Sequence, residues 1–69
     1  MREIRVSIAI QSHLSDACIE MGFDQEMAYR RIQFAKVLVM QFPDTSVEVS
    51  EDRLNELYKK YILKEVACY

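Results

Sequence analysis

The chain has 69 residues, with 9 basic and 11 acidic side chains, a net charge of −2, and only one glycine and one proline. This length allows a single domain, residues 1–69, and the composition excludes low-complexity, collagen-like and linker-rich chains. A domain of about 60 residues buries only about 60% of its unfolded surface, so a second copy of the chain is the simplest source of further stability. We therefore expect a homodimer.

The first expected element is a strand over residues 2–10. Apolar β-branched residues alternate there with polar or small ones, and this period of two is typical of a strand. Part of the segment also fits a helical stripe that continues to Met21, so one long helix over residues 4–21 stays open as the alternative. The apolar members of the alternation are Ile4, Val6, Ile8 and Ile10.

Two helices are expected next, separated by a turn at Gly22. The first covers about residues 13–21, and Gly22 follows it as the left-handed residue that often ends a helix. Asp24 caps a second helix over about residues 25–41, which Pro43 ends. This helix is apolar on most sides near its end, so we expect a second subunit to bury part of it. The apolar residues there include Phe34, Val37 and Leu38.

A third helix is expected over residues 51–66, after a connection from 43 to 50. Ser50 caps it, and its acids precede its lysines in the direction that the helix dipole favours. Its tyrosines lie among lysines, and we interpret them as core residues whose neighbours keep their ammonium groups in water. The expected fold class is mainly α: an N-terminal strand followed by three helices, or an all-helical dimer in the alternative.

Four features of residues 2–42 occur together: the alternation over 5–10, a helix closing at 21–22, a helix start at 23–24, and an Ala-Tyr-Arg-Arg-Ile run at 28–32. In this respect the chain resembles the ribbon-helix-helix superfamily, which consists of dimeric DNA-binding transcriptional regulators. The third helix lies outside the likeness, and we expect it to reinforce the dimer or to contact a partner protein.

The resemblance implies that two copies pair their N-terminal strands into a ribbon that enters the major groove of double-stranded DNA. It implies that Arg5 and Ser7 face outward and contact the DNA. Arg2 and the pair Arg30-Arg31 add positive charge for backbone contacts, although that pair also fits a solvated helix face. The predicted dimer or partner interface consists of Val6, Ile8, Ile10, Phe34, Val37 and Leu38.

A function of another class stays open: a non-enzymatic module that binds and inhibits or adapts a partner protein, as small accessory proteins of mobile elements do. The isoelectric point near 5.3 favours it. So do Asp24 and Glu26, because carboxylates at the start of the second helix repel phosphate. The apolar excess of that helix points the same way.

Catalysis, metal binding and membrane insertion find no support in the sequence. His13 stands near Asp16 and two serines, but residues one or two apart on a helix do not face each other. Cys18 and Cys68 match no metal-ligand spacing. We expect His13 to face solvent, and we expect no enzyme activity, metal or cofactor. The apolar runs are too short for a signal peptide or a membrane span, so we expect a cytoplasmic protein with reduced cysteines.

Overall fold

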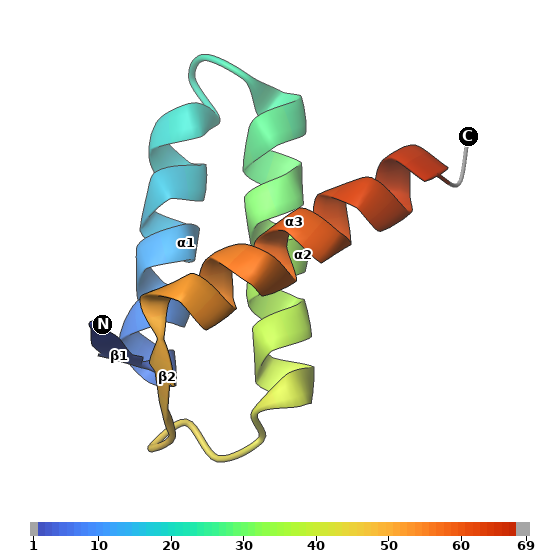
Figure 1. Cartoon of the computed structure of the whole chain (residues 1–69). Coiled ribbons are helices and arrows are strands. Elements are labelled where there is room, and N and C mark those ends of the chain that lie inside the picture. The colour runs from blue at the N-terminus through green and yellow to red at the C-terminus, as the bar shows by residue number, and fades with distance from the viewer. Residues whose placement is uncertain (1, 68–69) are drawn as a thin grey trace.

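A computed structural model describes residues 2–67 of the chain, and the side chains of residues 2–64. Within this part the fold is mainly helical, as the sequence predicts. Helices α1 and α2 form an antiparallel hairpin, and α3 crosses one side of it (Figure 1). In chain order the elements are β1 (Glu3–Arg5), α1 (Val6–Glu20), α2 (Gln25–Gln41), β2 (Glu48–Ser50) and α3 (Glu51–Ala67).

Strand β1 pairs within the chain. It lies antiparallel to β2, with Ile4 opposite Val49 and Arg5 opposite Glu48. Two further backbone hydrogen bonds extend the contact, from the N–H of Val6 to the oxygen of Val47 and from the N–H of Glu51 to the oxygen of Arg2. This short ribbon therefore fixes the start of α3 against the start of α1.

The strand predicted over residues 2–10 is wrong beyond residue 5, because residues 6–10 form the first turns of α1. The burial pattern gives the physical reason. Val6 and Ala9, three residues apart, are buried, whereas Ile8 is 59% exposed. A helical period places Val6 and Ala9 on one face, and the gain from packing that face against α2 outweighs the β preference of the isoleucines. The alternative of one long helix over residues 4–21 is closer to the structure, although α1 begins two residues later than that alternative predicts.

The turn between α1 and α2 does not need its glycine. None of the described residues has a positive φ angle, so the prediction of a left-handed Gly22 is wrong. A Cβ atom built on Gly22 would lie 3.9 Å from the nearest atom, the carbonyl oxygen of Ile19, which is an ordinary contact. The chain reverses instead through hydrogen bonds from the N–H groups of Phe23 and Asp24 to the carbonyl oxygen of Glu20.

Side-chain caps start the two following helices as predicted. One carboxylate oxygen of Asp24 accepts the N–H groups of Glu26 and Met27, at 3.1 and 3.2 Å, and α2 spans the predicted residues. The hydroxyl of Ser50 accepts the N–H of Arg53 at 3.2 Å at the start of α3. Each cap satisfies N–H groups that have no partner inside a helix.

The core lies where α3 crosses the hairpin. Phe34, Leu38 and Val6 are fully buried there. The rings of Tyr58 and Tyr61 on α3 pack against Phe34, with ring centroids at 4.9 and 5.8 Å, so the predicted core role of these tyrosines is confirmed. Between α1 and α2 the buried side chains are small, which lets the two helices approach closely. They are Ala17, Ala28 and Ala35.

Candidate functional site

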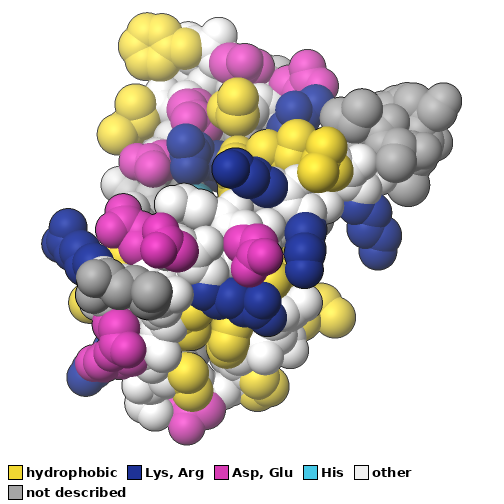
Figure 2. Space-filling model, in the orientation of Figure 1, with side chains coloured by type: hydrophobic (Ala, Val, Ile, Leu, Met, Phe, Trp, Pro, Cys, Tyr) yellow, Lys and Arg dark blue, Asp and Glu magenta, His cyan; other side chains and the backbone are white. Residues whose placement is uncertain are grey.

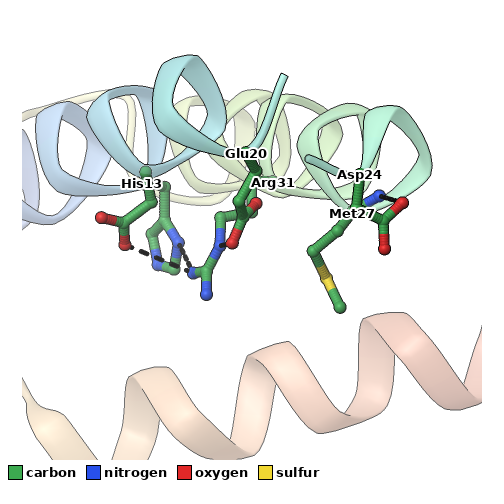
Figure 3. Close-up of polar contacts among 6 residues, drawn as sticks. His13, Glu20, Asp24, Met27 and Arg31 are labelled. Carbon is green, nitrogen blue, oxygen red and sulfur yellow. Dashed lines mark hydrogen bonds and ion pairs between the residues drawn. The ribbon is translucent and has the colours of Figure 1, made fainter. Parts of the chain in front are cut away.

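Arg31 on α2 is the centre of a polar cluster on the side of the hairpin that faces α3. Its Nε atom donates to Oε1 of Glu20 at 2.9 Å, and its Nη1 atom lies 3.6 Å from Oδ2 of Asp16. Nη1 also lies 3.2 Å from Nδ1 of His13, and Figure 3 shows the three labelled side chains His13, Glu20 and Arg31 converging. The carbon at the centre of the guanidinium lies 6.0 Å from the ring centroid of Tyr58 on α3. The cluster thus joins all three helices.

His13 does not face solvent, and that prediction is wrong. Its ring is half-buried between two aromatic rings. The ring centroids lie 5.0 Å apart in the edge contact with Phe34 and 6.0 Å apart in the stacked contact with Tyr58. Because a guanidinium has no acceptor, Nδ1 of His13 accepts from Arg31, and this assigns the proton of the neutral ring to Nε2. Sequence reasoning missed this position because the neighbouring rings come from α2 and α3.

Electrostatics keep His13 neutral and Arg31 charged. Burial lowers the pKa of His13 below its ordinary 6.5, and the positive charge of Arg31 lowers it further, while Asp16 and Glu20 partly oppose both effects. Burial acts to lower the pKa of Arg31 as well, but the hydrogen bond and charge of Glu20, aided by Tyr58 and Asp16, raise it above its usual value. In this arrangement Arg31 has no proton to exchange near neutral pH.

The residues predicted to contact DNA bases lie on different elements. Arg5 is the exposed last residue of β1, whereas Ser7 is half-buried in the first turn of α1. A strand that contacts bases needs both side chains on one outward face, two residues apart. Arg2, which precedes β1, lines a cavity of about 300 Å³ together with Ser12 and His13.

The predicted basic pair is held by carboxylates. Arg30 donates to Glu26 one helical turn earlier, at 3.1 Å. This pair agrees with the interpretation that Arg30 belongs to a solvated helix face. Arg31 turns the other way, to Glu20 on α1. Consecutive residues on a helix point about 100° apart, so these two arginines serve separate contacts.

Three of the six residues predicted for a dimer or partner interface, Val6, Phe34 and Leu38, are fully buried inside the chain's own core. Ile10 and Val37 are partly buried against the same core. Ile8 alone of the six is exposed. Other large apolar side chains lie on the surface. They include Ile19, Met21, Phe23, Tyr29, Met40 and Leu63.

A groove between α2 and α3 combines apolar and basic side chains. Its volume is about 210 Å³, and its half-buried lining consists of Val37, Leu57 and Tyr61. The exposed side chains of Lys60 and Lys64 stand at its rim with Gln41. Figure 2 shows basic side chains spread along α3 on this side of the molecule. The lysines can be read from the sequence, but the groove cannot be predicted from it, because the groove depends on how α3 crosses α2.

No family model matches this chain, and neither a curated protein nor a solved structure matches it at a significant level. Among the described residues, no group of three or more histidine, cysteine or acidic side chains is placed to hold a metal ion. In the same part of the chain, every helix is too short or too polar to cross a membrane.

Proposed function

We propose that the chain is a non-enzymatic protein-binding module, which inhibits or adapts a partner protein by holding an acidic and apolar segment of it in the α2–α3 groove. The observation that carries the proposal is the groove itself, with an apolar floor beneath two lysines. An amphipathic helix with acids on one flank is the type of segment that fits such a groove. Its apolar residues would cover Val37 and Leu57, and its acids would approach Lys60 and Lys64.

Charge favours a protein partner over DNA. The N-terminal turns of α3 carry Glu51, Asp52 and Glu56, and the start of α2 carries Asp24 and Glu26. Helix N-termini are the parts of a fold that commonly receive phosphate, and these two present carboxylates instead. The basic rim of the groove is confined to the later turns of α3, which is too small an area for the many phosphate contacts that duplex binding requires.

The test is a selection from a randomised peptide library against the purified protein. We expect enriched peptides to contain acids together with apolar residues at helical spacing. The double variant Lys60→Glu, Lys64→Glu should weaken the selected peptides at least about tenfold, because two attractive contacts become repulsive. The matched control is Lys59→Glu, which makes the same change at an exposed position of α3 that does not line the groove.

Two outcomes would contradict the proposal. One is a selection without enrichment, or with peptides that bind the double variant and the wild type equally. The other is salt-dependent binding of duplex DNA that the double variant abolishes. That second result would favour the DNA-binding regulator and assign the lysines of α3 to phosphate.

A further inference from the structure

The side of the hairpin turned away from α3 is apolar and nearly uncharged. The acids of α1, Asp16 and Glu20, both turn toward Arg31 on the α3 side. Helical spacing places a different set of side chains on the opposite side of the two helices, and we call this set the far face. Its apolar members are Leu14, Cys18, Met21, Tyr29, Ile32 and Val39, and Gln25 and Lys36 lie among them on α2.

The far face is exposed in a single chain. Leu14, Val39 and Tyr29 are 41%, 48% and 59% exposed. Near the turn, the far face opens into a mostly apolar groove of about 340 Å³, in which Met21 and Tyr29 stand over the buried Ala28. Protein surfaces are usually rich in charge, and the centre of an interface is depleted of it and enriched in aromatic residues and methionine.

We propose that the far face is the interface of a two-fold homodimer, in which two hairpins pack into a four-helix bundle and the α3 helices remain outside. The shortage of charged side chains supports a second copy as the occupant. A two-fold interface brings each surface against itself, so a face with a net charge would repel its copy. The far face carries one charged side chain, that of the exposed Lys36, one turn after Ile32 on α2, and its long flexible stem lets the ammonium group stay in water beside the contact.

The size of the far face also fits. Helices of 15 and 17 residues are about 22 to 26 Å long, and two of them side by side are about 20 Å wide. The footprint is therefore about 500 Å², so two copies bury about 1,000 Å² or more in total, which is the size at which specific interfaces begin. The core of one chain adds a reason to dimerise, since four of the nine buried apolar residues in the described part of the chain are alanines: Ala9, Ala17, Ala28 and Ala35.

The homodimer goes beyond the proposed function, because it uses the opposite side of the hairpin and leaves both α2–α3 grooves open. Light scattering of the purified chain should give a mass of twice 8.2 kDa at micromolar concentrations. Leu14→Lys and Val39→Lys should each raise the dissociation constant at least about tenfold, because each buries a charge opposite its own copy. Both positions are exposed in the single chain, so circular dichroism should report an unchanged helix content.

The matched control is Leu63→Lys, the same type of change at a residue of α3 that is 66% exposed. It should leave the dimer intact, as should the groove variant Lys60→Glu, Lys64→Glu, so the failure of one proposal can be distinguished from the failure of the other.

A nitroxide on Cys18, in a Cys68→Ser background, should report one defined distance between copies, and Val39→Lys should remove that signal. A monomer at 0.5 mM (~4 mg/mL) would overturn the proposal and leave the far face to another partner. So would a dimer that Leu63→Lys breaks and Val39→Lys does not.

Discussion

The two sides of the α1–α2 hairpin are built from the same two helices but bury their residues by different means. On the α3 side, aromatic rings surround Phe34, and the charged groups around Arg31 pair with one another. The far face has aliphatic side chains, Tyr29 and almost no charge. On a side that its own chain partly covers, polar groups lose water and are stabilised by partners, and here the partners of Arg31 come from α1. The far face meets no such demand, so it suits a flat and extended contact with another hairpin.

The largest expected effect separates the two sides by stability. Phe34→Ala should lower the free energy of unfolding by about 3–5 kcal/mol, because it leaves a cavity where three aromatic rings meet a fully buried ring. Val39→Ala, on the exposed far face, should change it by about 0.5 kcal/mol or less. Urea titration measures both, in a Leu14→Lys background in which contacts between copies do not contribute.

A Phe34→Ala chain that no longer folds is replaced in this test by Phe34→Leu, with an expected loss of about 1–2 kcal/mol. Equal losses at Phe34 and Val39 would contradict the comparison, because they would mean that both sides are equally covered within one chain.

Local signals in the sequence identify α2 and the start of α3, but they do not identify α1. Asp24 and Ser50 are caps that act on their own backbone neighbours, so they can be recognised without knowing the fold. The segment from Ile4 to Ile10 fits both periods, and only packing against α2 decides for the helix. His13 is a similar case, because the rings that contact it lie more than twenty residues later in the chain.

The candidate surfaces were predictable only in part. The expectation of excess apolar surface on α2 is met by Tyr29, Val39 and Met40. The residues singled out for an interface, Phe34 above all, are instead those that α3 covers. Which side of an apolar helix its own chain covers depends on the path of a later element, and composition does not contain that information.

A medium effect is expected at Arg31. Arg31→Met removes the partner of Glu20, whose Oε2 atom is already buried without a hydrogen bond among the described residues. The loss should be about 1–3 kcal/mol, the cost of leaving a partly buried polar group unpaired. Arg30→Met is the matched control on the next residue of α2. It breaks a one-turn pair with the exposed Glu26 and should cost about 0.5 kcal/mol or less. Urea titration of both variants at pH 7.5 measures the contrast, and equal losses would mean that the cluster adds nothing beyond a surface pair.

The smallest effect is a pH dependence that only the α3 side can produce. His13 is the single histidine of the chain, and its pKa in the folded state lies below its ordinary 6.5. Between pH 7.5 and 5.5 the unfolded chain therefore binds more protons than the folded chain, so the free energy of unfolding should fall as the pH falls. Protonation places a positive ring beside Arg31 and removes the acceptor of its hydrogen bond, while Asp16 and Glu20 limit the effect. His13→Asn keeps an acceptor near the Nδ1 position but does not titrate, so it should flatten this slope in urea titrations at several pH values. A slope that His13→Asn leaves unchanged would mean that the proton binds elsewhere and that His13 is not coupled to the packing of α3.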